Sequence, residues 1–530
     1  MSTLSQSRHH AILMSVYVIT GSDNFVPQIH KQILYGKEHI MKIGFDREDS
    51  SMSKIGFDNQ KYLTMQSEHI KERISHFGDK LYLEFGGKLY DDYHASRVLP
   101  GFMPDSKLRM LLQLKDQAEI VIAISAGAIA SNKIRGDLGI TYDEDVLRLM
   151  DVFRSFGLYV GSVAITQYTG EAAADEFRHH LDSLGVPSYI LHKIDGYPSN
   201  IEHIVSDEGF GKNDYIKTSR PLVVVTAPGP GSGKMATCLS QLYHEHKRGV
   251  SAGYAKFETF PVWNLPLKHP VNIAYEAATA DLNDVNMIDP FHLESYGKTT
   301  INYNRDVEIY PVLKAMFERI YGTCAYQSPT DMGVNMVGNC ISDDEVCREA
   351  GKAEIIRRYY TEICNIKKGL GSKDALYKIE LLMKQAEISP ADRKVAVAAM
   401  EVENQTHQPA VAIELDDGSI IDGKTSDLLS APAAALLNVL KELAGIDHEK
   451  LLISPEALQP ISRLKKNYLG SNDASLHSDE VLVALSISSN TDANAKAAFD
   501  QLPNLKTLNV HSSVMLDEVD EQIFKKLGMY

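Results

Sequence analysis

Short β-rich segments alternate with helical stretches through the first half of the chain, and this alternation constrains the fold more than any other feature. Residues 143–156 and 172–184 carry apolar side chains at helical spacing. The strand candidates around them are residues 80–85, 119–125, 159–167, 187–192 and 222–226. Strand–helix–strand alternation predicts a layered α/β fold with a mainly parallel sheet, Rossmann-like or phosphate-loop-like in type.

A glycine-rich turn, Gly229-Pro230-Gly231-Ser232-Gly233-Lys234, joins the strand at 222–226 to a helix at 234–247, and a strand at 252–257 follows. Glycine permits positive φ and lets backbone amides approach an oxygen closely. The helix start adds partial positive charge, and the lysine adds a flexible ammonium group. We therefore predict a phosphate site for ATP or another phosphate ligand, bound by Gly229, Gly231, Ser232, Gly233, Lys234 and Thr237.

The turn departs from the common phosphate-loop pattern at two positions. Pro228 replaces the first glycine, and Met235 stands where a magnesium-binding hydroxyl is expected. Ser232 and Thr237 are the nearby hydroxyl groups that could replace it. The alternative interpretation is a tight strand–helix connection that binds no ligand.

The loop, its helix and the segment Gly253-Tyr254-Ala255-Lys256-Phe257-Glu258 together resemble the phosphate-loop synthetases related to dethiobiotin synthetase and the synthetase domain of CTP synthase. In that class a lysine on the second strand lies near the nucleotide phosphates, and acidic residues hold magnesium. The resemblance covers about residues 221–258 and implies a catalytic role for Lys256. It also implies that Glu258 and Asp281 bind Mg²⁺.

A second resemblance spans residues 54–527. The strings YLEFGGK at 82–88, HASRVLPG at 94–101 and APGPGSGK at 227–234 are similar to those of a large bacterial family catalogued as a domain of unknown function. This resemblance implies a shared fold, but it does not indicate which activity the protein has.

Two further candidates follow the strand at 80–85. Ligands of open α/β sheets bind at the carboxyl ends of strands, and His94 and Arg97 come soon after this one. Arg97 is suited to grip a carboxylate or phosphate with two nitrogens, and His94 to transfer a proton near neutral pH. A solvated turn with a salt bridge is an equal alternative. The proline-rich segment 256–289 predicts a long irregular loop over the site.

The charge and the cysteine content limit which binding partners and which cellular location we expect. The chain has 54 Lys and Arg against 70 Asp and Glu, a formal charge of −16, which argues against nucleic acid or an anionic membrane as a partner. Its five cysteines show no pair spaced two residues apart as in zinc sites, which indicates reduced thiols and a cytoplasmic location. The oligomeric state is left open, a homo-oligomer included.

Changes in composition along the sequence predict that the chain is organised in four structural parts. Residues 1–52 form an N-terminal extension that could also reflect a misassigned start. Residues 41–46 are nearly repeated at 53–58, and Met52 stands directly before this second copy. Residues 53–340 form the α/β body with the phosphate loop at 228–235, and residues 341–404 a helical module. Residues 405–530 form a smaller α+β domain with a hairpin about 416–417, helices at 431–443 and 455–466, and strands at 480–487 and 505–510.

These features predict a nucleotide-dependent enzyme of the ligase or phosphotransferase type that acts on a small molecule. Two alternatives come from other classes of protein. One is a non-catalytic regulatory protein that binds a phosphorylated metabolite, which Met235 favours. The other is an oligomeric structural protein in which the loop binds nothing.

Overall fold

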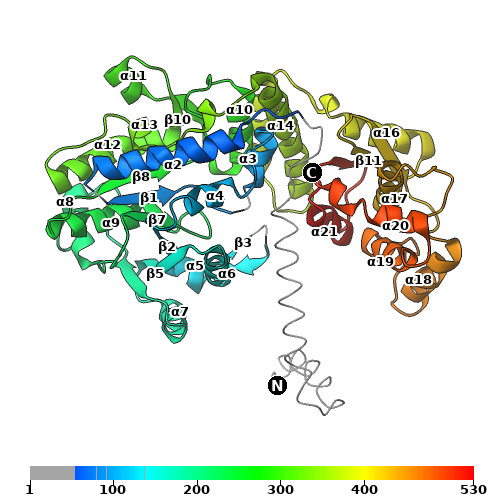
Figure 1. Cartoon of the computed structure of the whole chain (residues 1–530), viewed down its shortest axis with the longest axis horizontal. Coiled ribbons are helices and arrows are strands. Elements are labelled where there is room, and N and C mark those ends of the chain that lie inside the picture. Colours follow the sequence, from blue (N-terminus) through cyan, green and yellow to red (C-terminus); the bar gives the residue numbers. More distant parts are fainter. Residues whose placement is uncertain (1–53, 79, 91, 136–137) are drawn as a thin grey trace, which may run out of the picture. The chain divides into compact units, whose positions relative to one another are not determined.

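A computed structural model describes residues 54–78, 80–90, 92–135 and 138–530 (Figure 1); the predicted N-terminal extension lies outside the described residues. Its largest sheet has six strands in the order β6-β5-β2-β7-β1-β8, and every neighbouring pair is parallel. The strands are β1 (Leu81–Phe85), β2 (Ala118–Ser125), β5 (Tyr159–Tyr168), β6 (Ser188–His192), β7 (Leu222–Thr226) and β8 (Gly253–Phe257). The predicted α/β class with a mainly parallel sheet is confirmed.

Both faces of this sheet are covered by helices. On one face, Leu222 and Val224 of β7 pack in the cluster that includes α2 (Asn59–His76) and α6 (Tyr142–Ser155). On the other face, Val223 and Val225 pack with α9 (Lys234–Lys247) and α12 (Asn304–Tyr321). Strands buried on both faces explain why the β7 sequence is apolar without alternation.

The order of the strands creates a switch point at the centre of the sheet. After β2 the chain passes through α5 (Ala126–Ala130) and α6 to β5 on one side, whereas after β7 it passes through α9 to β8 on the other side. Because β2 and β7 are neighbours, the two connections diverge from adjacent strand ends. Open α/β sheets bind ligands in the crevice at such a point, which here lies beside the glycine-rich loop.

The remaining elements of the α/β part surround the sheet. Two short antiparallel pairs, β3 with β4 and β9 with β10, lie outside it. These elements are α3 (Tyr93–Val98), α4 (Ser106–Leu112), β3 (Ile134–Arg135), β4 (Ile140–Thr141), α7 (Ala172–Ser183), α8 (Ile201–Ile204), α10 (Pro270–Ala278), β9 (Asn286–Ile288), α11 (Pro290–Tyr296), β10 (Ile301–Tyr303) and α13 (Pro329–Met332).

Helices α14 (Asp344–Lys367), α15 (Lys373–Gln385) and α16 (Lys394–Thr406) follow. The C-terminal part then has an antiparallel sheet in the order β12-β11-β13, with its own apolar core. Its elements are β11 (Ala410–Glu414), β12 (Ile420–Lys424), α17 (Ala431–Leu443), α18 (Pro455–Asn467), α19 (Ser478–Ser488), α20 (Ala493–Phe499), β13 (Asn509–Ser512) and α21 (Glu518–Lys526). None of the described helices is long and apolar enough to cross a membrane.

Two expectations about local structure are wrong, and the strand predicted at 505–510 is displaced to β13, which begins at Asn509. The strand predicted at 480–487 is helix α19, because His477 and Glu480 form a capping box and Val481, Ala484 and Leu485 are buried at helical spacing. The loop predicted at 256–289 contains α10, which begins at Pro270. Proline is tolerated at the first position of a helix because its missing N–H would have no partner there.

Candidate phosphate-binding site

The glycines of the loop between β7 and α9 meet separate steric requirements. Gly231 has a φ of +77° and Gly233 a φ of +79°, values that favour glycine. A Cβ on Gly229 would lie 2.3 Å from the hydroxyl oxygen of Tyr142, and one on Gly233 would lie 2.8 Å from Oγ1 of Thr166. The loop therefore fits tightly against α6 and β5.

Side-chain donors hold the carbonyl groups of this loop. Thr166 Oγ1 donates to the carbonyl of Ser232 at 2.8 Å, and Gln167 Nε2 donates to that of Gly231 at 3.0 Å. The two candidate hydroxyls are also used locally, because Ser232 Oγ donates to the Gly229 carbonyl at 2.8 Å and Thr237 Oγ1 to the Gly233 carbonyl at 2.9 Å.

The amide groups of the same loop remain available. In the described part of the chain, the backbone amides of residues 231–236 donate no hydrogen bond, and no side chain caps the start of α9. The first amides of a helix have no partner within the helix, and a helix start attracts anions. The loop therefore presents a set of donors to whatever lies in front of it.

A cavity of about 480 Å³ lies in front of these amides. Residues 231–237 form one wall, and the carboxyl ends of β1, β5 and β6 contribute the others. The remaining lining residues are Glu84, Thr166, Gln167, Leu191, His192, Lys193, Ile194, Tyr197, Phe210 and Asn213. Its volume is in the range of small-molecule sites, roughly 300–1,000 Å³, and it combines cationic with apolar walls.

Glu84 connects this cavity to a second polar group. Its carboxylate is buried and accepts a hydrogen bond from the Tyr254 hydroxyl at 2.5 Å. On the next strand, Lys256 lies opposite Glu84 in the sheet register. Lys256 Nζ contacts Asp306 at 2.6 Å and Glu258 at 2.9 Å. Two carboxylates thus contact one ammonium group near the edge of the sheet, and the Glu84 carboxylate acts on it electrostatically.

The charges of these neighbouring side chains shift the pKa values of Glu258 and Lys256. Burial raises the pKa of Glu258 to about 7; the Lys256 charge opposes this shift, and the Asp306 and Glu84 carboxylates reinforce it. Burial alone would lower the pKa of Lys256, but Asp306, Glu258 and Glu84 together raise it above its usual value. Glu258 is therefore able to exchange a proton near neutral pH.

The structure brings together only part of the predicted magnesium and catalytic set. Lys256 and Glu258 are in contact, whereas Asp281 is exposed and acts electrostatically on Lys378 of α15. None of these predicted residues lines the cavity. Asp306, at the start of α12, is the carboxylate that completes the Lys256 group instead.

The other two predicted residues lie in a different cluster. His94 and Arg97 are on α3, and both contact Glu354 of α14, through His94 Nδ1 at 3.2 Å and Arg97 Nε at 2.8 Å. Neither side chain lines the cavity beside the loop. Arg97 therefore makes the salt bridge that the sequence left open as an alternative, and it does not line the cavity.

Sequence reasoning missed several residues that line the cavity. Thr166, Gln167 and His192 lie at the ends of strands that the sequence predicted, and Lys193 follows directly. Because parallel strands end at one edge of a sheet, the last residues of each predicted strand were a usable signal. Asp306 had no such signal, since its contact with Lys256 joins residues far apart in sequence.

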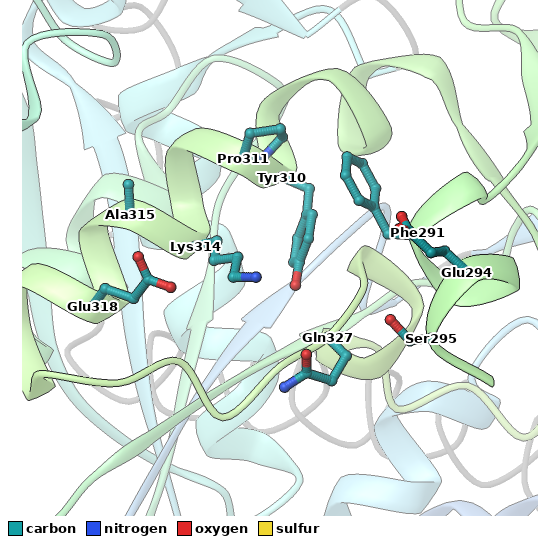
Figure 2. A pocket seen from close by; sticks show the side chains of 9 residues that line it. All are labelled: Phe291, Glu294, Ser295, Tyr310, Pro311, Lys314, Ala315, Glu318 and Gln327. Atoms are coloured by element: carbon teal, nitrogen blue, oxygen red, sulfur yellow. The ribbon is translucent and has the colours of Figure 1, made fainter.

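A second cavity, of about 370 Å³, lies between α11 and α12 (Figure 2). Lys314 and Glu318 of α12 line one side, and Phe291 and Glu294 of α11 line the other. It contains none of the residues that the sequence predicted. One lysine beside two carboxylates gives it no excess of positive charge for a phosphate.

Two family models match consecutive parts of this chain. Residues 55–387 match the model described as domain of unknown function DUF1846, N-terminal, and residues 391–530 match DUF1846, C-terminal. A UPF0371 protein of Streptococcus sanguinis (strain SK36) is 58% identical over 479 residues, which cover 90% of this chain and 97% of the relative. A UPF0371 protein of Streptococcus pneumoniae (strain JJA) is 57% identical over 478 residues, with the same coverage. The predicted resemblance to a family of unknown function is confirmed.

Proposed function

This chain belongs to the DUF1846 family, and we propose that it is a nucleotide-dependent enzyme whose loop at residues 229–234 holds the phosphates of ATP or a related ligand. The observation that carries the proposal is the cavity at the switch point, into which the start of α9 presents backbone amides without other acceptors. Lys234 adds a charge that pairs with no carboxylate among the described residues. Together these groups supply the donors that a phosphate requires.

The rest of the cavity suits the organic part of such a ligand. Leu191, Ile194 and Tyr197 give it an apolar wall, and His192 and Lys193 add polar groups at the end of β6. A ligand with a phosphate at one end and a ring at the other matches this division.

The proposed reaction is of the ligase or phosphotransferase type. Amides and Lys234 would stabilise the negative charge that develops on the phosphoryl oxygens. Glu258 lies outside the cavity lining, next to Glu84 through Lys256, and with a raised pKa near neutrality it would accept the proton of an acceptor that extends to this group.

Mg²⁺ would neutralise phosphate charge when bound. Glu84 is the carboxylate of the cavity lining and would hold the ion there. Among the residues that the sequence suggested for this role, Glu258 is paired with Lys256, and Asp281 is exposed in a short 3₁₀ helix, Ala280–Leu282.

Calorimetric titration of ATP, with and without Mg²⁺, into the wild-type chain and Lys234→Ala tests the binding step. Loss of a charge-assisted hydrogen bond costs about 1.5–3 kcal/mol, so the Kd should rise at least about tenfold. Lys247→Ala is the matched control, because it removes an exposed lysine from the other end of the same helix, where it pairs with Asp207. Equal ATP affinity in wild type and Lys234→Ala would refute the assignment.

A turnover assay then separates an enzyme from a regulatory protein. The wild-type chain is incubated with Mg-ATP and a panel of small carboxylates and alcohols, and ADP or AMP release is measured. An enzyme releases product with at least one acceptor and loses this activity in Lys234→Ala. Binding without product would favour the regulatory alternative that Met235 suggests.

A further inference from the structure

A second cluster of charged side chains, on α3 and α14, has no role in the proposed function. Its centre is Glu354, whose side chain is 1% exposed. This carboxylate accepts hydrogen bonds from Arg97 Nε at 2.8 Å, Arg357 Nε at 2.6 Å and Arg358 Nε at 2.9 Å. His94 Nδ1 contacts it at 3.2 Å. One buried carboxylate is thus shared by three guanidinium groups.

Other groups compensate the charge of this cluster only in part. The guanidinium of Arg97 lies 5.2 Å from the centre of the Tyr530 ring, which offers an aromatic face and no full negative charge. A fourth guanidinium, that of Arg393, donates to the backbone oxygens of Val510 and Tyr530. Positive charge is concentrated here in a chain whose formal net charge is −16.

Arg358 is the least compensated member of the cluster. Glu354 is the only carboxylate that it contacts among the described residues, through Nε, and its NH2 group meets the ring nitrogen of His94 at 3.4 Å. Burial together with the charges of Arg357 and Arg97 lowers the pKa of Arg358 to about 10, although Glu354 opposes the shift. The side chain is 25% exposed, so a ligand can reach it.

A partly buried guanidinium without a full counter-charge is costly, and two requirements follow for a group that would relieve it. The group must be anionic, and it must offer two oxygens to the paired nitrogens of an arginine. Carboxylate and phosphate groups meet both requirements. We propose that Arg358, with Arg97 and Arg357 behind it, forms a binding site for an oxyanion of this kind, separate from the phosphate loop.

The alternative is a purely structural clasp in which the arginines fix α3 to α14 through Glu354. The two explanations predict opposite signs when the Arg358 charge is removed without ligand. A clasp loses an ion pair, and Arg358→Met lowers the melting temperature. A vacant anion site loses the contact with Glu354 but also the repulsion from Arg97 and Arg357, so the melting temperature stays the same or rises.

The test uses the full chain with Lys234→Ala, so that the loop contributes less to binding. Inorganic phosphate and succinate are titrated separately by calorimetry at low ionic strength, which shows whether the site prefers phosphate or carboxylate. Arg358→Met in this background should weaken binding of the preferred anion at least tenfold. Arg348→Met is the matched control on the same helix, because Arg348 makes an exposed i,i+4 pair with Asp344. Binding should be unchanged in that variant.

Melting curves without anion and with the preferred anion complete the test. The proposal predicts an anion-dependent rise in melting temperature in Lys234→Ala that Arg358→Met abolishes. It is overturned if neither anion binds Lys234→Ala, or if Arg358→Met binds as tightly as its parent. Should Arg358→Met not fold, Arg358→Lys serves instead, since it keeps the charge but loses the two-pronged geometry. The Lys variant should bind more weakly, and unchanged affinity would also overturn the proposal.

Discussion

At the scale of single residues, the group formed by Lys256, Glu258 and Asp306 shows how position alone gives an ordinary side chain unusual chemistry. Lys256 lies at the end of a buried strand, and both carboxylates are within 3 Å of its ammonium, at 2.9 Å and 2.6 Å. One positive charge cannot fully stabilise the neighbouring negative charges in a buried position. Glu258 therefore holds its proton to a higher pH than a solvated glutamate.

This shift predicts a pH-dependent contribution to stability. The pKa of Glu258 is about 7 in the folded chain, against an ordinary value of 4.5. The folded state therefore binds more protons between these pH values. The contribution is complete below pH 4.5 and is lost as the pH rises towards 7. In Glu258→Gln, the free energy of unfolding should fall less over this interval than in the wild type.

Urea denaturation at intervals between pH 4.5 and 7.5 measures this difference. Glu308→Gln is the control, because Glu308 is an exposed residue of the same helix that carries Asp306. Its profile should follow that of the wild type. A Glu258→Gln profile parallel to the wild type would show that Glu258 titrates as a solvated carboxyl.

At the scale of elements, the junction of β7, the loop and α9 was predictable from sequence. The strand at 222–226 and the helix at 234–247 have the predicted bounds, because an apolar run, a set of glycines and an amphipathic stretch are each local signals. Helix α19 was not predictable in this way, since its run of Val and Ile residues also suits a strand. Its capping box was the signal that decided the outcome.

The residues of the candidate site also differ in how far the sequence could predict them. Its glycines and Lys234 were found because their chemistry is local. Glu84 and Asp306 act through partners on other elements, Tyr254 and Lys256, and no local pattern marks such pairs. For Arg97 the sequence left a ligand-gripping role and a salt bridge equally open, and its partner is Glu354 on a helix more than two hundred residues later.

Two substitutions in the loop distinguish the contribution of backbone conformation to stability from the contribution of side-chain packing. Gly231 and Gly233 both have positive φ, but only a Cβ on Gly233 meets another atom, Oγ1 of Thr166 at 2.8 Å. Gly231→Ala should cost about 1 kcal/mol of unfolding free energy from backbone strain. Gly233→Ala should cost at least about 1 kcal/mol more, because Thr166 must also move. Urea denaturation of both variants measures the difference, and equal losses would contradict the packing described for this loop.

At the scale of the whole molecule, two charge patterns coexist. The chain as a whole is acidic, with a formal charge of −16, yet the start of α9 and the cluster around Arg358 concentrate donors and positive charge. A phosphate ligand approaching this chain meets an unfavourable average field and favourable local sites. Binding therefore depends on a few groups, and variants of single residues should have large effects.

Hydrogen exchange with mass spectrometry shows directly whether the cavity beside the loop binds phosphate. With saturating ATP or another phosphate ligand, peptides that cover residues 229–237 should exchange more slowly, because the amides of 231–236 gain acceptors. Peptides that cover 190–194 should follow, and at a ligand concentration near the wild-type Kd, Lys234→Ala should show much weaker protection of both regions. Protection confined to other regions, with exchange at 229–237 unchanged, would contradict the account.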